Sequence, residues 1–99
     1  MVQRTSVRQE RALKDFGINI RRWRKVNGMS ASDLATRAFV TRETLRNIES
    51  GSGSPRADSV FAVLTALGIV ETILAASNPF NSETARARID DILNSGGDM

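Results

Sequence analysis

Apolar residues recur along the chain at the spacing of amphipathic helices. The clearest stripe lies in the first third, where the steps between apolar positions are three, four and three residues. Its members are Leu13, Phe16, Ile20 and Trp23. This spacing predicts a helix from about Gln9 to Asn27 with one buried face. Asn27-Gly28 is a typical helix end, because glycine adopts the left-handed conformation without strain.

Shorter helices are expected after this one. Three polar residues are suited to cap the start of a helix: Ser30, Thr41 and Ser82. Asp33, three residues after Ser30, would complete a capping box there. With Gly51 and Gly68 as stops, the pattern predicts helices over about 30–38, 41–50, 57–67, 70–76 and 82–93. No stretch shows the alternation of a strand. We therefore predict an all-α protein of five to six helices.

The same pattern suggests a division of the chain. Residues 1–8, which include Arg4 and Arg8, are expected to form a flexible basic arm, and residues 9–76 one helical domain. Residues 77–94 are expected to form a C-terminal helix that contacts a second copy or another partner, although an ordinary solvated helix fits equally well. Residues 95–99 are expected to be a disordered tail.

The amino-acid composition excludes most kinds of enzyme active site. The 99 residues include no Cys, His or Tyr, so disulfides, Cys/His zinc sites and the usual neutral-pH bases and nucleophiles are excluded. The adjacent acidic pair Asp90-Asp91 is expected to point to different sides of a helix. We therefore expect no enzymatic activity, no cofactor and no metal site.

Charge is distributed unevenly. Residues 1–50 carry eleven Lys/Arg against five Asp/Glu, a balance of +6, whereas residues 51–99 carry three against six, a balance of −3. The basic half suits a polyanion, although a solvated basic surface is the simpler alternative. Residues 61–76 form the longest apolar-rich run, which is shorter than the roughly 20 residues that span a bilayer. The expected location is cytoplasmic, in association with the nucleoid.

Two short helices joined by a short connection, residues 30–38 and 41–50, predict a helix-turn-helix. In the second helix Val40, Leu45 and Ile48 are expected to face inward. The polar residues left on the open face are candidates for reading base edges. These are Arg42, Glu43, Thr44, Arg46 and Asn47. The alternative is a surface helix stabilised by contacts among its own side chains. Arg42 and Arg46 form an unfavourable like-charge pair at i,i+4, although a pair between Arg46 and Glu43 at i,i+3 stays open.

Residues 28–69 resemble the Cro/cI-type (XRE) helix-turn-helix family. The resemblance rests on Gly28-Met29-Ser30, Leu34-Ala35, Ala38, Val40-Thr41-Arg42, Leu45 and Ile48-Glu49-Ser50-Gly51, together with Pro55 and Ala66-Leu67-Gly68. It implies a lambda-repressor-like DNA-binding domain that binds double-stranded operator DNA. The family also implies a structural ion pair between Arg24 and Glu49.

Backbone phosphates are expected to be bound by residues around the second and third helices. The candidates are Arg21, Arg24, Lys25, Ser30, Arg37, Thr41 and Ser52. Two positions depart from the family. Ala31 stands where a phosphate-binding Gln is common, and Phe39 stands where the turn usually has Gly. Because Phe tolerates positive φ poorly, we expect the turn to differ slightly or Phe39 to pack outward against a partner.

The C-terminal part is similar in layout to HipB-type antitoxins, which implies a HipA-like kinase toxin as a partner. Twelve of the sixteen residues in 61–76 are apolar, more than one helix face accommodates. A fully wrapped core helix would explain them, but we favour a twofold homodimer interface on a palindromic operator. The interface candidates are Phe61, Val63, Ile69, Val70, Ile73 and Leu74.

Overall fold

The computed structural model describes residues 6–99, which contain six α-helices, one 3-10 helix and no strand. The all-α prediction is confirmed. The helices are α1 (Val7–Val26), α2 (Ala31–Ala38), α3 (Arg42–Glu49), α4 (Ala57–Leu67), α5 (Val70–Ser77), η1 (Pro79–Asn81) and α6 (Glu83–Asn94). Each expected helix is present, with ends that differ from the prediction by two residues at most.

The chain divides after Ile69 into two compact units. The first contains α1 to α4 and the second contains α5, η1 and α6. The sequence had placed the boundary after Ala76, so α5 was assigned to the other side. The physical reason is that Gly68 ends α4 in the left-handed conformation (φ 79°), and Ile69 is the last side chain buried with α4, whereas α5 has no buried residue.

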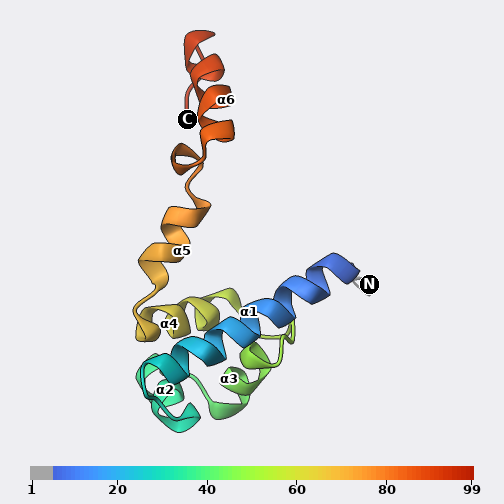
Figure 1. Ribbon diagram of the computed structural model, residues 1–99, viewed down its shortest axis with the longest axis vertical. Helices are drawn as coiled ribbons and strands as arrows, with labels where there is room; N and C mark the ends of the chain where they lie inside the picture. The colour runs from blue at the N-terminus through green and yellow to red at the C-terminus, as the bar shows by residue number, and fades with distance from the viewer. Residues whose placement is uncertain (1–5) are drawn as a thin grey trace. The chain divides into compact units, whose positions relative to one another are not determined.

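The core of the first unit draws on all four of its helices. Within it α1 packs against α3 and α4, and α2 packs against the same two helices (Figure 1). The buried apolar side chains are Ile20, Leu34, Ala35, Ala38, Leu45, Ile48, Val63, Leu64, Leu67 and Ile69. Small Ala35 and Ala38 allow α2 to approach its neighbours closely.

Two of the expected interface residues belong to this core. Val63 is completely buried and Ile69 nearly so, which rules both out as members of a surface interface. The buried side of α4 passes through Val63, Leu64 and Leu67, at helical spacing. Phe61 lies off that side and is exposed.

Polar caps fix where α2 and α3 begin. The Ser30 hydroxyl accepts a hydrogen bond from the Asp33 N–H (3.0 Å), and the Ser30 N–H donates to the Asp33 carboxylate (3.2 Å). Hydrogen bonds from Ser30 hold the pKa of the Asp33 carboxyl below its usual range. At the start of α3 the Thr41 hydroxyl is the cap, and it accepts from the Thr44 N–H (3.0 Å).

The ends of the described chain also differ from expectation. Ser6 and Gln9 form a capping box, so α1 begins at Val7 and takes in Arg8, which the sequence had assigned to a flexible arm. Arg4, the other arm residue of interest, lies outside the described residues. At the other end, the N–H groups of Gly96 and Gly97 donate to carbonyls of α6 (3.2 and 2.9 Å), so the expected disordered tail begins with an ordered helix cap.

Phe39 occupies the left-handed conformation (φ 56°, ψ 39°) that ends α2. The turn therefore keeps the geometry that Gly would adopt, so the first of our two expectations, an altered turn, is wrong; the second, contact of an outward Phe39 with a partner, stays a prediction. The cost is roughly 1–2 kcal/mol for a residue with a Cβ. Phe39 gains nothing in return from burial, because 95% of its surface is exposed.

Glycine lets α1 lie directly on the end of α3. A Cβ at Gly17 would lie 2.5 Å from the Glu49 carbonyl oxygen and 2.6 Å from that of Ile48. A Cβ at Gly51 would lie 2.7 Å from the Cα of Lys14. Both obstacles are backbone atoms, which cannot rotate away, so these glycines set the distance between the two helices.

We predict that Gly17→Ala lowers the free energy of unfolding by about 1–3 kcal/mol, since α1 must move away from α3. Urea denaturation followed by circular dichroism measures this change. Gly53→Ala is the matched control, because its Cβ would meet Leu13 at an ordinary 3.6 Å. Equal stability of both variants would show that α1 and α3 can separate without loss.

We also predict that Phe39→Asn raises the free energy of unfolding by about 0.5–1 kcal/mol, because Asn adopts the left-handed conformation more readily. Thermal or urea denaturation measures the gain. Phe39→Ala is the control: it removes the same exposed ring, but Ala lacks the polar side chain that makes the left-handed conformation favourable for Asn. A stabilised Ala variant would mean that the ring, rather than the backbone conformation, is the source of strain.

Candidate nucleic-acid interface

The polar face of α3 is held outward by the apolar face on its other side. Leu45 and Ile48 are buried, which leaves Arg42, Glu43 and Arg46 exposed. Their side chains project from a helix whose backbone is fixed by the Thr41 cap and by core packing. A short row of two guanidinium groups and one carboxylate therefore faces solvent.

The two remaining base-reading candidates lie at the edge of this row. Thr44 and Asn47 are partly buried. The Thr44 hydroxyl accepts a hydrogen bond from the Thr41 hydroxyl (2.9 Å). The main-chain carbonyl of Asn47 accepts from the Ser50 hydroxyl and the Ser52 N–H, which leaves the side-chain amide itself outside these bonds. Less of each side chain is available to a ligand than for the three exposed residues.

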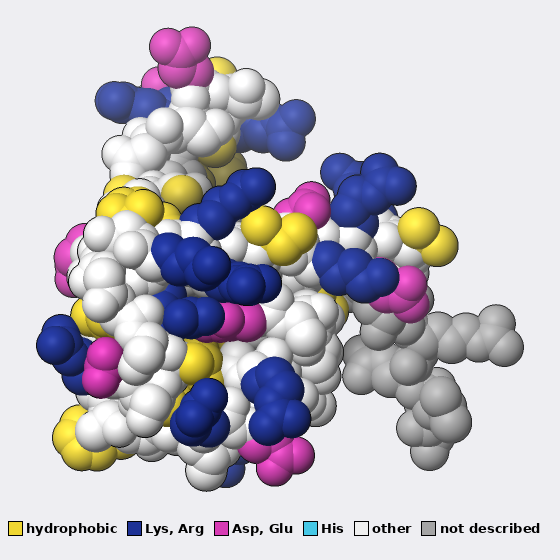
Figure 2. Space-filling model, turned by 60° about the horizontal axis from the view of Figure 1, so that its bottom comes forward, with side chains coloured by type: hydrophobic (Ala, Val, Ile, Leu, Met, Phe, Trp, Pro, Cys, Tyr) yellow, Lys and Arg dark blue, Asp and Glu magenta, His cyan; other side chains and the backbone are white. Residues whose placement is uncertain are grey.

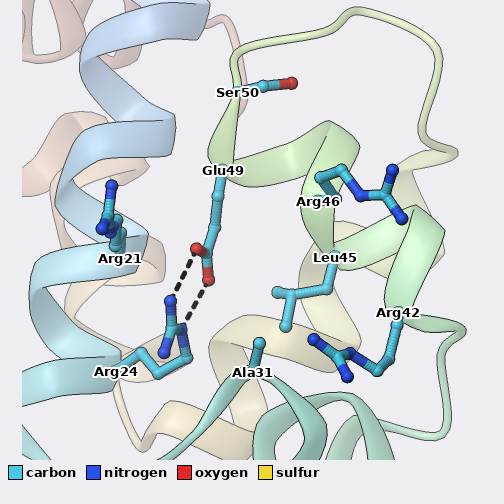
Figure 3. A pocket seen from close by; sticks show the side chains of 8 residues that line it. All are labelled: Arg21, Arg24, Ala31, Arg42, Leu45, Arg46, Glu49 and Ser50. Atoms are coloured by element: carbon cyan, nitrogen blue, oxygen red, sulfur yellow. Dashed lines mark hydrogen bonds and ion pairs between the residues drawn. The ribbon is translucent and has the colours of Figure 1, made fainter.

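An open hollow of about 310 Å³ lies beside the row, between α1, α2 and α3 (Figure 3). Its lining combines four guanidinium groups with one carboxylate and the first residue of α2. The lining residues are Arg21, Arg24, Ala31, Arg42, Leu45, Arg46, Glu49 and Ser50. We call this site the arginine hollow.

One of the four arginines is already paired. Arg24 donates to both carboxylate oxygens of Glu49, from Nε at 2.8 Å and Nη2 at 3.0 Å, and donates to the Met29 carbonyl at 3.2 Å. Both side chains are only 13% exposed. The Glu49 carboxylate raises the pKa of Arg24 above its usual value. The two residues named as a structural pair are thus brought together, and they tie α1 to the end of α3.

The comparisons with known proteins agree with this arrangement. A family model described as helix-turn-helix matches residues 20–73, which is more than half of the chain. The chain belongs to the helix-turn-helix family. No curated protein matches, and no solved structure matches.

The family to which the chain belongs indicates its general activity, which is DNA binding. The helix-turn-helix match, of XRE type, together with the all-helical first unit, gives a lambda-repressor-like fold and identifies a DNA-binding transcription regulator. This family consists of DNA-binding proteins and is not an enzyme family. Within residues 6–99, no single helix is long and apolar enough to cross a bilayer. Only the bent pair of α4 and α5, taken together, has the required length and composition, and three residues of α4 are buried in the core.

The expected phosphate-binding residues of this helix-turn-helix do not form a single cluster. Arg21 lines the arginine hollow, while Lys25 and Arg37 are exposed outside its lining. The caps Ser30 and Thr41 are exposed, but their hydroxyls already hold the starts of α2 and α3.

Ser52 is less suited to bind phosphate than the sequence suggested. Its N–H donates to the Asn47 carbonyl (2.9 Å), and its hydroxyl bonds to the Ser54 hydroxyl (2.8 Å) and accepts from the Ser54 N–H (3.1 Å). These groups are used inside the chain to shape the loop after α3.

Three contributors to the site were absent from the predicted set of binding residues, although the sequence had marked Ala31 as standing at a phosphate-binding position. Ala31 and Ser50 line the arginine hollow, and the Met29 carbonyl helps to hold Arg24. Only Ala31 left a signal: as the first residue of α2 it brings the N-terminal end of that helix to the hollow, where exposed N–H groups favour anions. Because the Ala31 side chain is only a methyl group, it leaves the N-terminal end of α2 more accessible than a Gln side chain would.

The remaining interface candidates lie at the surface to different degrees. Phe61 and Leu74 are exposed, whereas Val70 and Ile73 are partly buried. They belong to different units, since Phe61 precedes the division at Ile69 and the other three follow it.

We predict that Glu49→Ala lowers the free energy of unfolding by about 2–3 kcal/mol, because Arg24 keeps its charge and loses two hydrogen bonds in a mostly buried place. Urea denaturation followed by the fluorescence of Trp23, the single tryptophan, measures the loss. Arg21→Ala, on the same hollow but exposed, should change stability by less than about 0.5 kcal/mol. Equal effects would mean that the ion pair contributes no more than a surface charge.

Proposed function

We propose that this protein is a sequence-specific repressor that binds a palindromic DNA operator as a homodimer. The observation that carries the proposal is the row Arg42, Glu43 and Arg46 on α3, exposed beside the arginine hollow. In the helix-turn-helix docking geometry the second helix of the motif, here α3, enters the major groove.

Each residue of the row has a role that fits its chemistry. Arg42 and Arg46 are the residues most suited to donate paired hydrogen bonds to guanine N7 and O6, and Glu43 is suited to accept from cytosine N4. Asn47 and Thr44, at the partly buried edge, are proposed to make additional base contacts. A good paired contact contributes about 1–3 kcal/mol of discrimination against a wrong base.

The surroundings of the row suit the sugar-phosphate backbone. With Arg24 neutralised by Glu49, Arg21 and the N-terminal end of α2 remain as anion-binding groups in the hollow. Lysine and arginine side chains gather on one face of the molecule (Figure 2). Lys25 and Arg37 are proposed to add phosphate contacts, with a smaller contribution from the cap residues Ser30 and Thr41. Such contacts supply affinity and orientation without reading sequence.

Repression would follow from occupancy of a promoter by the dimer. A twofold dimer presents two copies of α3, and their separation would match successive major grooves of a palindrome, about 34 Å apart. We propose autoregulation of a toxin–antitoxin operon as the biological setting, on the basis of the HipB-like layout of the C-terminal part.

The alternative is an antitoxin whose main role is to bind a HipA-like kinase toxin. The exposed apolar side chains of the second unit favour some protein partner. Co-purification with the product of the adjacent gene would separate this role from repression alone.

We predict that Arg42→Ala and Arg46→Ala each lower discrimination between operator and scrambled DNA by about tenfold or more, since each removes a paired base contact. The operator is first located by footprinting the protein on its own promoter, and affinities are then measured by fluorescence anisotropy. Because both side chains are exposed, thermal unfolding should be nearly unchanged.

Lys25→Ala is the control for this experiment. It should weaken binding to both DNAs by a similar factor and reduce the slope of log affinity against log salt by about one. Unchanged discrimination in both arginine variants would refute the base-reading assignment. If the protein protected no sequence in its own promoter, the proposal that an operator lies there would be contradicted.

A further inference from the structure

Phe39 is the most exposed large apolar side chain within residues 6–99, with 95% of its surface open to solvent. In the same range it is also the single residue other than glycine with a positive φ, 56°. The ring is not buried and the backbone is strained, and no contact within the described chain offsets either cost. Strained backbone is concentrated at sites that bind ligands. Phe39 is therefore a candidate for a binding role.

The position of Phe39 brings it close to the proposed DNA-reading face. It ends α2 and lies two residues before Thr41, the cap of α3. When the second helix of the motif enters the major groove, its N-terminal residues contact the base edges. In the proposed function these are Arg42 and Glu43. The connection that carries Phe39 therefore lies at the same groove, beside the first turn of α3.

The surroundings of the ring favour DNA over a protein. Residues 34–42 contain two arginines, Arg37 and Arg42, which are both exposed, and no acidic residue. This charge suits a polyanion. A stable protein interface covers roughly 800 Å² on each partner, whereas one aromatic side chain supplies at most about 250 Å². The exposed neighbours Thr36, Arg37 and Thr41 are polar, so they add little apolar surface.

The major groove offers one apolar group on its base edges, the C5-methyl group of thymine. Phenylalanine is suited to contact this group, because the methyl group and the ring are then both removed from water. The deoxyribose rings also have apolar surface, but they are the same in every sequence. A contact with them would add affinity without discrimination.

We propose that Phe39 is a specificity-determining residue that packs its ring against a thymine methyl group beside the bases read by α3. The inference deepens the proposed function and rests on it, because it requires α3 in the major groove. It adds a preference for an A·T pair to the guanine and cytosine contacts assigned to α3. It also explains why a strained Phe occupies a turn that Gly or Asn would form more readily.

The test uses the full chain and the operator located by footprinting. In synthetic operator duplexes, each thymine in turn is replaced by deoxyuridine, which lacks only the C5-methyl group, and affinity is measured by fluorescence anisotropy. At one thymine position the wild type should bind about fourfold more weakly per substituted half-site, which is the effect of one buried methyl group. Phe39→Ala should bind both duplexes equally at this position and respond like the wild type at all others.

Two further variants serve as controls. Val7→Ala shortens another exposed apolar side chain of the first unit and should keep the wild-type response to every substitution. Phe39→Asn should be more stable than the wild type and should nevertheless lose the thymine preference, as Phe39→Ala does. A residue with a purely structural role would not combine a gain in stability with a loss of this preference. Circular dichroism verifies that each variant keeps its helix content.

Three results would overturn the inference. In the first, Phe39→Ala abolishes the response to no thymine position. In the second, Phe39→Ala weakens operator and scrambled DNA equally, which would place the ring on the sugar. In the third, its operator affinity equals that of the wild type, which would leave the ring to a protein partner.

These results are distinguishable from a failure of the proposed function. A wild type that does not discriminate between operator and scrambled DNA would contradict the proposed function, and this inference with it. Normal discrimination by the wild type without a thymine position that depends on Phe39 would contradict this inference alone.

Discussion

The close contact of α1 with the end of α3 is the constraint on which the rest of the first unit depends. Gly17 and Gly51 allow the backbones to touch, and the Arg24–Glu49 pair fixes the two helices at that distance. The polar face of α3 points outward because its other face, with Leu45 and Ile48, is held in the core. A carboxylate and a guanidinium deep in the site are thus part of the scaffold, while Arg42 and Arg46 remain free to bind.

Much of this could be predicted from the sequence. The helices followed from apolar spacing and from Ser30, Thr41 and Gly68 as starts and stops, because caps and periodicity are local properties. The exposed row on α3 followed from the same periodicity. The Arg24–Glu49 partners came from the family resemblance alone, since no local pattern links residues 25 positions apart in sequence.

Properties that depend on tertiary packing were harder to predict. Gly17 looked like any helical glycine, because its neighbour Glu49 is far away in sequence. Val63 and Ile69 were assigned to an interface because an apolar-rich run does not reveal which side of α4 meets the core. Phe39 keeps the left-handed turn because the surrounding α2 and α3 determine its backbone, which overrides the preference of the residue itself.

The fixed contact between α1 and α3 also affects how sequence preference can change during evolution. Since the Cβ of any larger residue at Gly17 would collide with backbone, α3 has little freedom to tilt or slide on the scaffold. If α3 reads bases as proposed, new operator preferences would therefore arise by exchanging side chains on a helix that stays in place. Arg42, Glu43 and Arg46 can vary in this way at little cost to folding, because none of them is buried.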